Sequence, residues 1–150
     1  MDLLLWRHAD AEDGAPDLAR KLTPKGHRQA ARVAEWLRQH VPPGFELLSS
    51  PAVRAQQTAD ALGVAFQTSP LLAPGAPVAS ILSAAGWPDR QSAAILVGHQ
   101  PDFGRAAAFL VSGEEREWRI DKGGLWWLAG ERHAFVKAVI SPEVISPDLL

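Results

Sequence analysis

Short, largely apolar runs alternate with helical segments along this 150-residue chain. The runs lie at Leu3–Trp6, Phe45–Leu48 and residues 93–97, and runs of this length are typical of strands covered on both faces. Helix signals follow each run, and strands that alternate with helices favour parallel pairing. Leu125–Leu128 and Phe135–Ile140 are expected to form an antiparallel pair. The pattern predicts a three-layer αβα fold of the α/β class, with a mostly parallel central sheet and an antiparallel edge.

Local signals place shorter elements between these strands. Ser50 is expected to cap a helix whose first residue is Pro51. A short strand is expected near Val64–Phe66, and a short helix over Pro77–Ala85. Because no stretch has the composition of a linker, residues 1–150 are predicted to form a single domain.

Composition and charge narrow the class of protein. With 47% hydrophobic residues the chain can bury a core, and a net charge of −2 argues against nucleic acid as a partner. The absence of cysteine excludes disulfides and thiol chemistry. No apolar run approaches a membrane span, and the N-terminus does not resemble a signal peptide. We therefore expect a cytoplasmic protein without a membrane partner, either a monomer or a weak dimer.

Polar side chains follow three of the predicted strands at the point where each strand ends. Arg7 and His8 follow the first, and His99 follows Gly98 at the end of the third. The second strand ends in two serines, and Arg54 comes one helical turn later. Ligands of parallel α/β sheets bind outside the carboxyl ends of the strands. The sequence therefore predicts a pocket that contains two arginines and two histidines.

This combination of side chains suits phosphoryl transfer. Guanidinium groups match the geometry of phosphate oxygens, and helix N-termini add backbone donors. A neutral histidine can attack phosphorus and form a covalent phosphohistidine. A second histidine, if protonated, can stabilise the group in transfer. Water would then complete the reaction.

The motifs resemble those of a known family, the histidine phosphatase superfamily with its phosphoglycerate-mutase-like fold. "RHA" at 7–9 is similar to that family's RHG signature, "SSPAVRAQQTA" at 49–59 to its second motif, and "VGHQP" at 97–101 to its second histidine motif. "LTPKG" at 22–26 also fits. The short chain and the "D..R.LT..G" pattern of 17–26 resemble the SixA-like branch of phosphohistidine phosphatases.

The resemblance implies a role for each matching residue. His8 would be the nucleophile that accepts phosphate, and His99 the second, charge-stabilising histidine that also contacts the phosphate. Arg7 and Arg54 would bind phosphate, and Arg20 is expected to flank the pocket as a further phosphate-binding residue. No cofactor and no metal ion are implied.

Two departures from the family pattern stand out. Ala9 replaces the usual glycine after the nucleophile, so we expect an ordinary backbone conformation there. Members of the resembled family that act on sugar phosphates share a Glu or Asp after the second motif, which protonates the leaving oxygen. In this sequence, Leu62 through Pro88 contains no Asp or Glu. A phosphohistidine substrate can leave without such an acid. The absence favours phosphohistidine, carried on a protein domain, although Asp10 or Asp102 remains a possible acid.

Other functions stay open at this stage. A small-molecule phosphomonoesterase of the same superfamily would act on a small phosphorylated substrate. A metallohydrolase would use His8, Asp10 and His99, but two nearby arginines would repel its metal. A non-catalytic phosphate-binding module would use the arginines and need no nucleophile.

Overall fold

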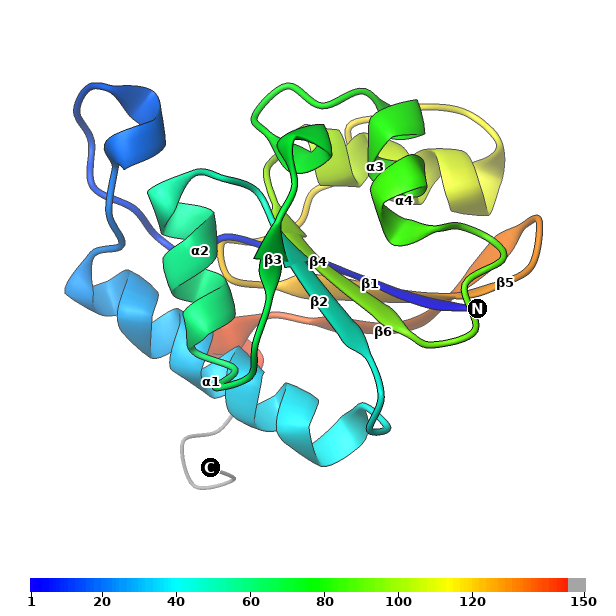
Figure 1. Ribbon diagram of the computed structural model, residues 1–150, viewed down its shortest axis with the longest axis horizontal. Helices are drawn as coiled ribbons and strands as arrows, with labels where there is room; N and C mark the ends of the chain where they lie inside the picture. Colours follow the sequence, from blue (N-terminus) through cyan, green and yellow to red (C-terminus); the bar gives the residue numbers. More distant parts are fainter. Residues whose placement is uncertain (146–150) are drawn as a thin grey trace.

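A computed structural model describes residues 1–145, and a six-stranded sheet in the order β3-β2-β4-β1-β5-β6 forms its centre (Figure 1). The strands are β1 (Asp2–Arg7), β2 (Glu46–Ser49), β3 (Gln67–Thr68), β4 (Ala94–Gly98), β5 (Leu125–Gly130) and β6 (Ala134–Ile140). β1, β2, β3 and β4 are parallel to their neighbours in this group, whereas β5 pairs antiparallel with β1 and with β6. The predicted parallel sheet with an antiparallel edge is confirmed.

Helices cover both faces of the sheet (Figure 1). They are α1 (Pro24–His40), α2 (Val53–Asp60), α3 (Val78–Ala85) and α4 (Asp102–Ser112), with short 3-10 turns η1 (Asp17–Ala19), η2 (Pro70–Leu72) and η3 (Pro142–Val144). Side chains of α1 and α2 belong to one buried cluster, and those of α3 and α4 to another. The αβα layering predicted from the sequence is therefore confirmed. None of the helices within residues 1–145 has the length and apolarity needed to cross a membrane.

The first strand shows why its apolar run is continuous. Leu4 and Trp6 point into the cluster beneath α1 and α2, while Leu3 and Leu5 point into the cluster beneath α3 and α4. All four side chains are fully buried. A strand at the centre of a three-layer fold must be apolar on both faces. Packing on both faces thus fixes the position of β1 up to Arg7, its last residue.

Two local predictions were wrong in position. α2 begins at Val53 rather than at Pro51, because the backbone of Ser50 is still bonded to β4, with its N–H donating to the Val97 carbonyl at 2.9 Å. The Ser50 side chain is buried and does not cap the helix. The short strand expected at Val64–Phe66 lies at Gln67–Thr68, where pairing with β2 sets its register. The helix predicted over 77–85 is confirmed as α3.

Gly26 allows α1 to begin against the loop that follows His8. A Cβ atom at this position would lie 2.0 Å from the carbonyl oxygen of Asp10. The same oxygen accepts a 3.0 Å hydrogen bond from the Thr23 amide. Because the obstructing atom belongs to the backbone, it cannot rotate away from an added methyl group. The absence of a side chain at Gly26 therefore couples the helix to the loop.

We predict that Gly26→Ala destabilises the fold by about 1–3 kcal/mol, the usual cost of overpacking. Urea unfolding measures this loss, and His27→Ala is the control because His27 is the exposed neighbour in the same helical turn. Equal stability of Gly26→Ala and the parent protein would contradict the role given to this contact.

Candidate active site

Backbone hydrogen bonds continue past the ends of the central strands and fix the residues that follow. The His8 amide donates to the Gly98 carbonyl at 3.0 Å, and the Gly123 amide donates to the His8 carbonyl at 3.1 Å. The register also aligns Arg7 with Gly98. The sheet therefore brings Arg7, His8 and His99 to one edge, as the sequence predicted. The rings of His8 and His99 are 5.1 Å apart between centroids.

The tautomer of His8 follows from its hydrogen bond. Its Nδ1 lies 2.8 Å from the Ala9 carbonyl oxygen, which only accepts, so Nδ1 carries the proton. The remaining nitrogen, Nε2, then holds a free lone pair. Burial lowers the pKa of His8 to about 4, with Arg54 and Arg7 lowering it further and the Ala9 carbonyl opposing them. His8 is therefore a neutral imidazole near pH 7, which is the form that a nucleophile requires.

His99 is neutral too, with its two nitrogens in opposite roles. Nδ1 lies 3.4 Å from Arg54 Nη2, which only donates, so Nδ1 is the acceptor. Nε2–H then donates to the Ser50 hydroxyl at 2.8 Å. Burial lowers the pKa of His99 to about 3, and His8 and Arg54 add to the effect. A charged His99, as expected from the sequence, would therefore require a proton taken up with a bound anion.

Arg54 reaches the edge of the sheet from α2 and is almost wholly buried. Its Nη1 donates to the Asp17 carbonyl at 2.8 Å, and its Nη2 lies 3.2 Å from the Asp17 carboxylate. Arg7 Nη1 donates to the Ile120 carbonyl at 2.8 Å. The Nε atoms of both arginines are buried without a hydrogen-bond partner within residues 1–145. Because these Nε atoms are closed to solvent, the oxygens of a bound anion would instead contact the partly exposed guanidinium of Arg7.

Arg20 and Asp17 form the outer wall of this arrangement, on the segment that carries η1 beside α2 (Figure 1). Arg20 Nη1 pairs with the Asp17 carboxylate at 3.1 Å, and its Nε donates to the Glu12 carbonyl at 2.7 Å. Arg20 also contributes to the lowered pKa of His8. Asp17 thus bridges two arginines of the site. Sequence reasoning missed this role, although Asp17 is the first residue of the quoted "D..R.LT" pattern.

Neither candidate acid has a free carboxylate. Asp10 accepts from the Thr23 hydroxyl at 2.7 Å and from Lys122 Nζ at 2.9 Å. These contacts lower its pKa, which disfavours a role as proton donor. Asp102 Oδ2 accepts from the amides of Gly75 and Ala76, and burial raises the pKa of this carboxyl. Both carboxylates hold loops in place, and of the two only Asp102 has a pKa shifted in the direction that favours a proton donor.

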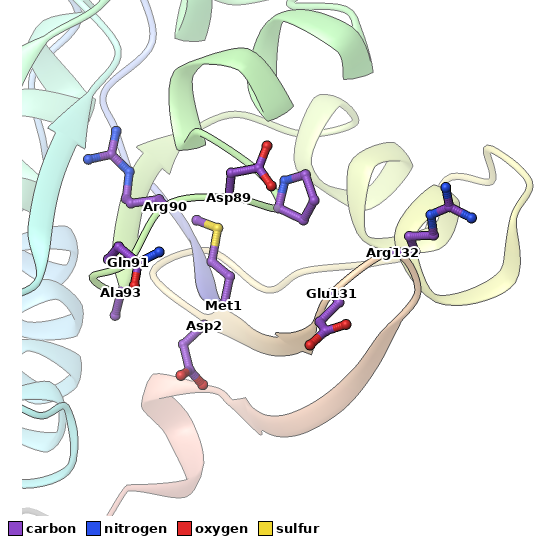
Figure 2. A pocket seen from close by; sticks show the side chains of 9 residues that line it. Met1, Asp2, Asp89, Arg90, Gln91, Ala93, Glu131 and Arg132 are labelled. Atoms are coloured by element: carbon purple, nitrogen blue, oxygen red, sulfur yellow. The ribbon is translucent and has the colours of Figure 1, made fainter.

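The hollow drawn in Figure 2 lies at the other end of the sheet. It begins at Met1 and Asp2, where β1 starts, and has a volume of about 580 Å³. Figure 2 shows Arg90, Glu131 and Arg132 around it, with acidic and basic side chains side by side. It contains none of the residues that the sequence singled out. The constellation at the carboxyl ends of the strands is therefore the candidate site.

Comparison with known proteins gives consistent results. The family model for the histidine phosphatase superfamily (branch 1) matches residues 3–75. An uncharacterized protein of Picosynechococcus is 39% identical over 125 residues, which is 76% of this chain and 75% of the relative. A phosphohistidine phosphatase SixA homolog of Haemophilus influenzae is 39% identical over 72 residues, 44% of each chain. The SixA structure from Nakamurella multipartitia superposes with a TM-score of 0.80 and 26% identity, covering 94% of this chain and 95% of that one.

The lowered pKa values give a prediction about protonation. Neither His8 nor His99 should gain a proton as the pH of the folded, phosphate-free protein falls from about 8 to about 5, since their pKa values are about 4 and 3. Nitrogen NMR of the histidine rings measures this directly. In urea the same rings should titrate near about 6.5.

Because the unfolded chain then binds more protons, the protein should lose stability as the pH falls from about 6.5 towards 4. Titration of His8 near 6.5 in the folded protein would contradict the electrostatic account of the site.

Proposed function

Because this chain belongs to the histidine phosphatase superfamily, we propose that it removes phosphate from phosphohistidine through a covalent phosphohistidine on His8. The observation that carries the proposal is the state of His8: a neutral ring with Nδ1 bonded to the Ala9 carbonyl and Nε2 left to react. Arg7 and Arg54 adjoin it with buried Nε donors that lack partners within the described residues. A nucleophile beside anion-binding donors is what phosphoryl transfer needs.

The reaction proceeds in two displacements. Arg7 and Arg54 hold the phosphoryl oxygens while His8 Nε2 attacks phosphorus. The substrate ring, already protonated from solvent on its second nitrogen, leaves as a neutral imidazole when the P–N bond breaks. Nδ1 of His8 keeps its proton in both displacements and continues to donate a hydrogen bond to the Ala9 carbonyl. Water then attacks phosphorus, the bond to Nε2 breaks, and one water proton passes to solvent. Inorganic phosphate leaves and His8 returns to its neutral form.

The substrate class follows from the acids at the site. An alkoxide leaving group has a conjugate acid near water's pKa of about 15.7, so a general acid matters for an ester. Imidazole has a reference pKa of about 6.5 and leaves more easily. The carboxylates of Asp10 and Asp102 are engaged elsewhere, and residues 62–88 hold no other acid. These features support a phosphoramidate substrate over an alkyl phosphate ester.

The positions of the candidate ligands disfavour a metallohydrolase that would bind its metal through His8, Asp10 and His99. Asp10, which such a site would need beside His8 and His99, is bonded to Thr23 and Lys122. Within residues 1–145, no three His, Asp or Glu side chains are grouped as a metal-binding set. The chemistry therefore falls to His8, Arg7 and Arg54, with His99 bonded beside them to Arg54.

We predict that incubation with phosphohistidine, followed by an alkaline quench, traps an acid-labile phosphate on His8. His8→Ala should lose both the trapped phosphate and at least about a thousandfold in turnover, as when a nucleophile is removed from a catalytic set. Mass spectrometry of the quenched protein locates the phosphate. His133→Ala, an exposed histidine in the turn between β5 and β6, serves as the control. Unchanged turnover by His8→Ala would overturn the mechanism.

We further predict that kcat/KM for phosphohistidine exceeds that for an alkyl phosphate such as phosphoserine by about 10²–10⁴, the usual contribution of a general acid. p-Nitrophenyl phosphate is the control, because its leaving group departs without a proton and its hydrolysis should be intermediate. Equal efficiency on phosphohistidine and phosphoserine would instead identify a general phosphomonoesterase. Phosphate binding without turnover of any of these compounds would identify a binding module.

A further inference from the structure

A second hollow opens beside the phosphate-binding arginines. It has a volume of about 500 Å³ and runs from Arg7 past the start of α1 to the segments before β5 and after β6. Its charged lining residues are Arg7, Lys25, Arg119, Asp121, Lys122 and Glu143. We refer to it as the cationic groove. It shares Arg7 with the candidate site, so a substrate bound at one lies next to the other.

The charge of this groove differs from that of the rest of the molecule. Four cationic side chains line it against two carboxylates. The hollow of Figure 2 instead has three carboxylates against two arginines and the N-terminal amine, and the whole chain has a net charge of −2. The groove therefore has a modest excess of positive charge beside the candidate site, although Asp10 pairs with Lys122 and the protein is acidic overall. A local field of this kind favours acidic partners and accelerates their association.

The backbone that carries these cations is bonded to the catalytic edge of the sheet. Arg7 donates to the Ile120 carbonyl, and the Gly123 amide donates to the His8 carbonyl. Lys122 bridges to Asp10, two residues after His8. These contacts fix residues 120–123 relative to the nucleophile. A ligand that touches Lys122 is thereby placed near His8.

Two cations of the groove remain available to a partner. The Arg119 side chain is 88% exposed, and its Nε lies 3.0 Å from the carboxylate of Asp121, its neighbour two residues on. Lys25 is exposed in the first turn of α1. Exposed guanidinium and ammonium groups exchange such weak contacts for a partner's carboxylates at little cost.

We infer that the cationic groove docks an acidic stretch of the protein that carries the phosphohistidine, an inference that rests on the proposed function. The phosphohistidine side chain itself would be held by Arg7 and Arg54 beside His8, and the groove would contact the residues that flank it. Asp121 and Glu143 interrupt the positive charge and would repel a continuous phosphate backbone, whereas a polypeptide can place basic or neutral side chains opposite them. The groove would thus select among phosphohistidine proteins by the charge beside the phosphohistidine.

Two short peptides test this inference, each carrying one phosphohistidine. In one peptide the residues flanking the phosphohistidine are glutamates, and in the other they are glutamines. At low ionic strength KM should be about fivefold lower for the glutamate peptide, as expected for two exposed charge pairs, and the difference should vanish at high salt. The double variant Lys25→Gln, Arg119→Gln should lose the difference while its kcat/KM on free phosphohistidine stays within about twofold.

Arg132→Glu is the matched control. It changes the net charge by the same amount, −2, but lies beside the hollow of Figure 2, and it should keep the preference for the glutamate peptide. Equal KM values for the two peptides, or an equal loss in Arg132→Glu, would overturn the groove proposal while turnover of free phosphohistidine remains. Failure to turn over free phosphohistidine would instead overturn the proposed function itself.

Discussion

The parallel hydrogen bonding between β1 and β4 holds His8 and His99 at one edge of the sheet. The ladder continues beyond the strands, because the His8 amide donates to the Gly98 carbonyl. A glycine at position 98 also leaves room for the Phe103 ring at the start of α4, since an added Cβ atom would lie 2.5 Å from that ring. Because β1 and β4 pair in a fixed register, the two histidines that follow them are held at a fixed separation. The remaining features of the site depend on this separation.

The electrostatics of the site follow from burying positive groups close together. The loss of solvent, and to a lesser extent the two guanidiniums, lower the pKa of both histidines, so both are uncharged in the phosphate-free protein. Asp17 offsets part of this concentrated positive charge by pairing with Arg54 and Arg20. A phosphoryl group would bring the negative charge that the arginines lack. The same excess of positive charge extends outwards into the cationic groove.

Much of the fold and of the site can be predicted from the sequence, because apolar runs and the polar residues after them are local signals. Arg7, His8 and His99 lie together because parallel strands end at the same edge. The contacts of Ser50 with His99 and of Asp17 with Arg54 span 49 and 37 residues. The periodicity of apolar residues along the chain does not predict which distant polar side chains come into contact. Ser50 has the local signature of a helix cap, but it is buried against His99, the residue that follows β4, and bonds to that ring instead.

The proposed chemistry depends on a fold that holds His8 neutral, with Nδ1 occupied and Nε2 free. The most direct measurement is phosphorus–nitrogen coupling in the NMR spectrum of the trapped phosphoenzyme, prepared with nitrogen-labelled histidine. Coupling of phosphorus to Nε2 of His8, with the Nδ1 proton still present, is the predicted result. Phosphate on Nδ1 would contradict the claim, because the Ala9 carbonyl would then have lost its donor. Phosphate on His99 in place of His8 would contradict it equally.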